Sequence, residues 1–196
     1  MSKALSETAL DTLFRNARSY SHWQDKPVTD EQCEKIYDLM KMGPTAANCC
    51  PARLVFIKSD AAKERLKAHL DEGNIKKCMT APAVVIIAMD MAFYEKLPFL
   101  FPHTDAKAWY TGKAEKIKAT AERNSTLQGA YFMLAARSLG LDVGPMSGFN
   151  NATLDADFFA DENYKANFIC ALGYGDDSGL YPRGPRLDFA QTCQII

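Results

Sequence analysis

The side chains best suited to binding or chemistry lie in four short segments and in the C-terminal tail of the chain. One segment pairs an arginine with serines, the second combines a proline, a threonine and an asparagine, and the third holds an asparagine and a lysine. The residues are Arg18, Ser19 and Ser21; Pro44, Thr45 and Asn48; Asn74 and Lys77; Pro145, Met146, Ser147 and Gly148; and, in the tail, Arg183 and Arg186. Any one of these groups alone is typical of a solvated surface, so only their combination indicates a site.

Two adjacent cysteines, Cys49 and Cys50, lie within the second segment. Neighbouring cysteines rarely form an unstrained disulfide, because the bond needs a special turn. A reactive thiolate needs a nearby cation or helix N-terminus, and Arg53 offers only a weak signal of that kind. We therefore favour the interpretation that two small side chains fill a tight loop, with a redox sensor as the alternative.

Familiar nucleotide-binding, hydrolase and metal motifs do not fit the sequence. The Gly173-Tyr174-Gly175 run begins like a dinucleotide fingerprint, but Gly179 comes one place late and the residues after it cannot open a helix. The residues around Ser147 do not form a nucleophile elbow. The histidines at positions 22, 69 and 103 lack ligand spacing with one another or with the cysteines, so we expect no metal site.

The composition indicates an ordinary globular chain. Its 196 residues fit one domain, expected to span positions 1–196, and 47% of them are apolar. The net charge of −1 gives no broad positive field for nucleic acid. No apolar core of a secretory signal and no run of about 18 apolar residues is present, so we expect no membrane span and a reduced, cytoplasmic protein.

Hydrophobic periodicity predicts the elements that position these segments. An amphipathic helix is expected over 6–16, and a second helix follows Thr29, a good N-cap, and ends near Gly43. A strand over 54–57 precedes a helix from Ser59 or Asp60 to about Leu70. The continuous apolar run over 83–88 predicts a strand buried on both faces. Residues 90–112 are irregular and rich in aromatic side chains.

The second half of the chain opens with a long helix predicted over 113–139, which Gly140 ends. From Leu127 onward this helix is apolar nearly all round, which is typical of a core or a subunit interface. Strands are expected over 143–146 and 168–172, with a helix over 152–159 between them, and a turn-rich tail follows. The order predicts a mixed α+β sandwich in which helices flank a central sheet.

Taken in order, the motifs resemble those of the flavin-dependent nitroreductase family over the whole chain. The order is Arg-Ser, Pro-Thr-x-x-Asn-x-x-Pro, Asn-x-x-Lys, Pro-x-x-Gly-Phe and a basic tail. No single motif is specific, whereas the ordered set is. The sequence is most similar to a short subgroup that includes malonic semialdehyde reductase of bacterial pyrimidine degradation, through runs such as GPTAANC, FPH, GPMSGF and GYGD.

The resemblance implies a nitroreductase-like sandwich with a mostly antiparallel central sheet, in an intertwined homodimer that binds FMN at two interfacial active sites. Arg18, Ser19 and Arg186 match the positions on the phosphate side, where a dianion needs fixed cations and hydroxyls. Asn74 and Lys77 match the positions at the pyrimidine edge of the flavin, where a cation would tune the potential.

Other matched positions lie near the flavin ring or come from the second subunit. The backbone N–H groups of Ser147 and Gly148, after Pro145 and Met146, would face flavin N5 and O4. Pro44, Thr45 and Asn48 would come from the partner subunit, and helix 113–139 would be central to the dimer core.

The sequence departs from the family pattern at three positions. Ser21 stands where many members have a basic residue, and Cys50 stands where a glutamine is usual. Gly184 replaces the usual lysine of the tail, and Arg183 could substitute for it one position away. Ser21 and Arg183 are therefore the less certain flavin ligands.

The activity implied is a ping-pong oxidoreductase that transfers hydride through flavin N5 with NADPH or NADH as co-substrate. The closer resemblance implies reduction of 3-oxopropanoate to 3-hydroxypropanoate, and the alternative is a broad nitroaromatic or quinone reductase. Arg53, His103 and Arg123 are candidates for binding a substrate carboxylate, although surface or capping roles are more common for such residues. The aromatic segment 93–112 could form a lid or a packed peripheral loop.

Overall fold

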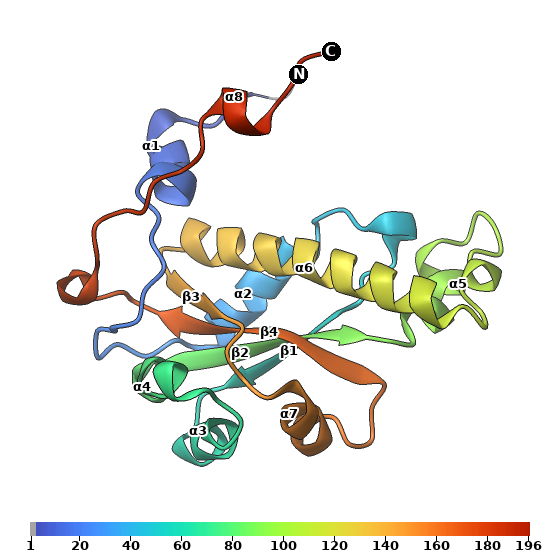
Figure 1. The fold of residues 1–196 in the computed structure, drawn as a ribbon, viewed down its shortest axis with the longest axis horizontal. Helices are drawn as coiled ribbons and strands as arrows, with labels where there is room; N and C mark the ends of the chain where they lie inside the picture. Colours follow the sequence, from blue (N-terminus) through green and yellow to red (C-terminus); the bar gives the residue numbers. More distant parts are fainter. Residues whose placement is uncertain (1–2) are drawn as a thin grey trace.

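A four-stranded antiparallel sheet with the strand order β1-β2-β4-β3 lies at the centre of the computed structural model, which describes residues 3–196 (Figure 1). The strands are β1 (Ala52–Ile57), β2 (Ala83–Asp90), β3 (Asp142–Met146) and β4 (Tyr164–Gly173). All three pairings are antiparallel, and a register shift interrupts the β2–β4 ladder between Ile87 and Ala88. The structure confirms the predicted α+β sandwich.

Helices cover both faces of the sheet (Figure 1). On one face lie α2 (Asp30–Met40) and the long α6 (Ala114–Ser138), and on the other lie α3 (Asp60–Lys67), α4 (Glu72–Thr80) and α7 (Asn151–Phe158). Side chains of β2 alternate between the two layers: Val85 and Ile87 join the core below α2 and α6, and Val84 and Ile86 join the core against α3, α4 and α7. The apolar run over 83–88 is therefore buried on both faces, as predicted.

Local sequence explains where the two main helices of the first layer begin and end. Thr29 caps α2 in a complete capping box, because its hydroxyl accepts from the Gln32 N–H while the Gln32 side chain accepts from the Thr29 N–H. Gly140 follows the end of α6 with a φ of +76°, a left-handed conformation that glycine adopts without a Cβ clash. Both boundaries confirm the sequence prediction.

Residues 6–16 and the segment between the first two strands differ from expectation. The predicted helix over 6–16 is a short α1 (Glu7–Leu10) continued by a π turn (Asp11–Arg15) that buries no residue. Between β1 and β2 there are two helices instead of one. Local sequence indicates α4 only weakly, because this helix is short and contains Gly73 and Asn74, which are weak helix formers.

The aromatic segment after β2 is a compact unit instead of an irregular loop. It contains a 3-10 turn (Phe93–Lys96), α5 (Leu97–Leu100) and a second turn (Lys107–Trp109) around a small core of its own. Another 3-10 turn (Ala46–Asn48) packs beside it, and the tail carries a 3-10 turn (Asp177–Gly179) and α8 (Phe189–Thr192). No helix among residues 3–196 is long and apolar enough to cross a membrane.

Candidate functional site

The segment that carries Arg18 and Ser19 lies along the outer edge of β3. Ser19 forms a parallel bridge with Val143, and the Tyr20 N–H donates to the Val143 carbonyl at 3.0 Å. The approach is close because Gly144 has no side chain: a Cβ there would lie 2.2 Å from the Tyr20 carbonyl oxygen. A glycine in β3 thus lets this segment extend the sheet and places Arg18 beside the end of α6.

Four arginines surround a polar pocket of about 360 Å³ at this end of the molecule. Arg18 and Ser19 come from the edge segment, and Arg183 and Arg186 come from the tail. The structure thus brings together Arg18, Ser19 and Arg186, the three residues expected on the phosphate side, with Arg183 beside them. The fourth arginine, Arg137, belongs to the last turn of α6 and was not predicted. No carboxylate lines the described pocket, so its field favours a doubly charged anion such as a phosphate.

Two hydrogen bonds attach the tail to the edge segment and so shape this arginine pocket. The Arg18 guanidinium donates to the Tyr181 carbonyl, and the Arg183 guanidinium donates to the Ala17 carbonyl at 2.8 Å. Arg137 donates to the Leu13 carbonyl at 3.4 Å. Burial lowers the pKa of Arg137, and the positive charge of Arg183 acts in the same direction. The arginines therefore repel one another, which a bound anion would relieve.

Asn74 and Lys77 on α4 meet the loop after β3, so a second predicted pair of segments is brought together. The Asn74 amide donates to the Gly148 carbonyl at 2.9 Å, and the Lys77 ammonium donates to the Asn74 side-chain oxygen at 3.3 Å. Pro145 and Ser147 are exposed beside them, whereas the Met146 side chain is buried under α4 and leaves only its backbone for a ligand. This cluster offers hydrogen-bond donors and a cation, which suit the polar edge of a heterocycle.

The segment after Tyr20 joins the arginine pocket to the cluster of Asn74 and Lys77. Ser21 lies half-buried in a bend of this segment, between the two groups. Two residues later the Trp23 indole N–H donates to the Lys77 carbonyl at 3.2 Å, which fixes the segment against α4. Residues 18–23 thus connect the arginine pocket, which suits an anion, with the polar cluster of Asn74 and Lys77. We call this connection the path.

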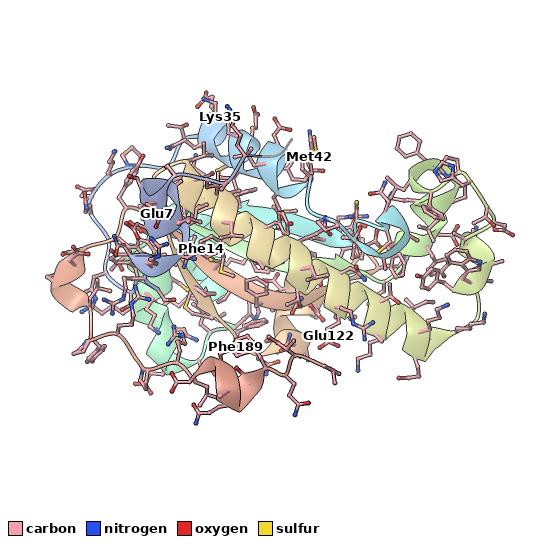
Figure 2. All side chains as sticks on the ribbon, turned by 90° about the horizontal axis from the view of Figure 1, so that it is seen from above. Glu7, Phe14, Lys35, Met42, Glu122 and Phe189 are labelled. Carbon is pink, nitrogen blue, oxygen red and sulfur yellow. The ribbon has the colours of Figure 1, made fainter. Side chains whose placement is uncertain are left out.

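The segment containing Pro44, Thr45 and Asn48 lies elsewhere. The Asn48 amide donates to the Leu100 carbonyl at 2.9 Å, and Asn124 of α6 accepts from the Ala46 N–H at 2.8 Å. Asn124 precedes Arg137 on the same helix by a stretch that corresponds to roughly 20 Å at 1.5 Å per residue. Figure 2 shows that these two parts of α6 lie far apart: Phe14 of the arginine pocket is at one end of the helix, and Glu122 is toward the other. One chain therefore does not bring this segment to the remaining site residues.

Cys49 fills the small core of the aromatic segment, and its neighbour Cys50 completes the loop. Cys49 is 1% exposed and packs with Phe93, Leu97 and Tyr110. The Cys50 N–H donates to the Thr45 hydroxyl at 3.1 Å. The backbone has positive φ angles at Ala47, Asn48 and Cys50, which strains a loop of non-glycine residues. Both thiols are free, which agrees with the packing interpretation.

Thiol labelling at pH 8 is expected to leave three cysteines untouched in the native protein. Burial raises the pKa of Cys49 and Cys78 to about 11 and that of Cys170 to about 12, so about one thiol in a thousand or fewer is ionised. The exposed Cys193 is expected to react first. Mass-spectrometric mapping after iodoacetamide, before and after denaturation, checks this order. Labelling of Cys49 as fast as Cys193 would contradict it and favour the redox-sensor alternative.

The three candidates for a substrate carboxylate have different surroundings. Arg53 donates to Asp90 at 2.5 Å and to the carbonyls of Cys50 and Ala52, so its guanidinium holds the start of β1. His103 is exposed and makes an edge contact with Phe101 at 5.4 Å between ring centroids. Arg123 lies on the exposed face of α6. Arg53 thus has a structural role, whereas the side chains of His103 and Arg123 form no hydrogen bond or ion pair with any residue from 3 to 196.

The chain belongs to the nitroreductase family, whose model matches residues 14–174. A Burkholderia lata protein named "Putative NADH dehydrogenase/NAD(P)H nitroreductase" is 57% identical over 97% of this chain and 98% of its own length. A protein of the same name from Polynucleobacter asymbioticus is 53% identical over the full length of both chains.

Solved structures share the fold at low sequence identity. A Bacillus subtilis nitroreductase superposes with a TM-score of 0.88 at 21% identity, over 97% of this chain and 100% of its own. A nitroreductase from Exiguobacterium sibiricum, solved in complex with FMN, superposes with a TM-score of 0.85 at 20% identity over all of both chains. These likenesses agree with the family assignment and confirm the predicted fold.

Proposed function

We propose that this chain is an FMN-dependent NAD(P)H oxidoreductase. The observation that carries the proposal is the continuous path from the four-arginine pocket, past Ser21, to the cluster of Asn74, Lys77 and the loop at Gly148. The FMN-bound Exiguobacterium structure and the NAD(P)H-related names of the relatives support this cofactor and co-substrate. When bound, FMN would supply the group that accepts and donates hydride.

The residues of the path have separate tasks in this proposal. Arg18, Ser19, Arg137, Arg183 and Arg186 would hold the FMN phosphate. Asn74 would present its amide to the pyrimidine edge of the ring, and the Lys77 ammonium would stabilise negative charge there. The loop of Pro145, Ser147 and Gly148 would limit access to one face of the ring, with the backbone of Met146 continuing this wall.

We further propose that the active unit is a homodimer. The exposed side chains of Leu127 and Tyr131 form an apolar surface on α6, and the tail exposes Leu187, Phe189, Ile195 and Ile196. A second copy would cover these surfaces and bring its own Pro44, Thr45 and Asn48 to the site that one chain leaves incomplete. Sedimentation velocity is expected to show a dimer at micromolar concentration, and a monomer that still turns over substrate would refute this proposal.

For the substrate we propose 3-oxopropanoate, reduced with NADPH or NADH in a ping-pong sequence. Nicotinamide and aldehyde would occupy the same pocket in turn, because the fold has a single sheet with no second nucleotide-binding unit among residues 3–196. Reduction of nitroaromatics or quinones is the second candidate, and the nitroreductase names of the relatives favour it.

The purified protein is expected to be yellow, or to become so with added FMN, and to oxidise NADPH or NADH in the presence of an acceptor. A chain that binds no FMN would overturn the cofactor proposal. Comparing the specificity constants for 3-oxopropanoate and for a nitroaromatic decides the substrate. Turnover of the nitroaromatic without turnover of the aldehyde acid would replace the first candidate by the second.

A further inference from the structure

A second polar pocket, of about 410 Å³, adjoins the path described above at Trp23 and shares no other residue with it. It is bounded by the segment from Trp23 to Val28, by Lys58 directly after β1, by Lys63 of α3 and by residues 80–82 at the end of α4. Figure 1 shows α3 and α4 beside each other on the face of the sheet opposite α6. None of the residues predicted for the family site lines this pocket.

Lys63 is the unusual member of this pocket. It is only 8% exposed, yet its ammonium forms no hydrogen bond or ion pair with any residue from 3 to 196. The other two lysines of the pocket are already engaged. Lys58 pairs with Asp30 at 2.5 Å, and the Lys26 ammonium lies 3.6 Å from the centre of the Tyr174 ring. Lys63 is therefore the one free ammonium that the pocket offers.

The buried stem of Lys63 holds its ammonium at the pocket, where the ammonium reaches solvent and has no counter-ion among residues 3–196, so an anion could pair with it there. Three lysines line the pocket against a single carboxylate, the exposed Asp25. Trp23, Val28 and Pro82 add apolar walls, so a ligand with an organic body would also be desolvated there. Both the charge and the shape favour a small molecule that carries an oxyanion.

We infer that this pocket is a binding site for a small oxyanion, a phosphate or a carboxylate, whose charge is neutralised by Lys63. Trp23 places a reporter in the wall of the site. The chain has two tryptophans, and the other, Trp109, lies in the aromatic segment beyond α5. The variant Trp109→Phe therefore isolates the emission of Trp23 in the full chain.

The test titrates Trp109→Phe with sodium phosphate and, separately, with sodium acetate at constant ionic strength. We expect a saturable change in Trp23 emission with at least one of the two anions, and the anion with the lower midpoint identifies the preferred oxyanion. Lys63→Met is expected to raise the midpoint at least tenfold, and Lys63→Arg to restore most of the affinity. Lys67→Met is the matched control, because Lys67 lies on the same helix and pairs with Glu64 at 3.1 Å outside the pocket.

Identical curves for Lys63→Met and Lys67→Met would overturn the inference, since anion bound at the arginine pocket would give that result. A linear response shared with chloride would also overturn it and would leave Lys63 as a cation that only complements the C-terminal end of α4. Circular dichroism on each variant confirms that the fold persists. The readout does not depend on FMN or on turnover, so failure here leaves the proposed activity untouched.

Discussion

Gly144→Ala is expected to destabilise the protein and to weaken FMN binding together. The added Cβ would lie 2.2 Å from the Tyr20 carbonyl oxygen, which is backbone and cannot rotate away. The segment with Arg18 and Ser19 must then leave the edge of β3 and lose the hydrogen bond from Tyr20 to Val143. Overpacking of this kind costs about 1–3 kcal/mol in the free energy of unfolding. Urea unfolding of the FMN-free chain and an FMN titration measure the two effects.

Gly73→Ala provides the matched control for this substitution. Gly73 lies in the first turn of α4, and nothing stands within 4 Å of the Cβ that alanine would add. The variant is expected to be neutral or slightly more stable, because alanine favours a helix over glycine by up to about 1 kcal/mol. Equal losses in the two variants, or an unchanged FMN affinity in Gly144→Ala, would contradict a positioning role for the close approach.

The elements that follow from strong local patterns are the ones the sequence predicts well. Thr29 and Gln32 set the start of α2, and the apolar run in β2 sets a strand covered on both faces. The order of the motifs also points to segments that lie together in the fold, namely Arg18 with Arg186 and Asn74 with Gly148. The types of the side chains and their order along the sequence are enough to predict these elements.

The remaining features depend on tertiary contacts that no local pattern records. Helix α4 forms because Cys78 packs against the core, in spite of weak helix formers near its start. Arg137 looks like an ordinary basic residue in the last turn of a helix until the tail folds beside it. Lys63 follows the polar pattern of α3, and only the packing of α4 and the segment at Trp23 makes it buried.

Arg186→Met is expected to weaken FMN binding without lowering the stability of the FMN-free chain. Among residues 3–196, Arg186 donates only to the carbonyls of Gly184 and Pro185, so its loss leaves the contacts that attach the tail in place. A charge-assisted hydrogen bond to a phosphate accounts for about 10- to 100-fold in affinity. Removing one of four like charges is expected to leave the unfolding midpoint unchanged or slightly higher, and to reduce the salt dependence of FMN binding. Fluorescence titration of FMN at two salt concentrations, with thermal unfolding of the FMN-free chain, measures all three quantities.

Arg15→Met separates this effect from the loss of any nearby positive charge. Arg15 is close in sequence to the site but pairs with Glu7 at 2.7 Å and with Asp11 at 2.8 Å, away from the arginine pocket. Its substitution is expected to change FMN affinity by no more than about twofold, since exposed ion pairs contribute little. A comparable loss in both variants would indicate a diffuse field in place of a phosphate site. A fall in the unfolding midpoint of Arg186→Met would mean that the four arginines support the tail more than they repel one another.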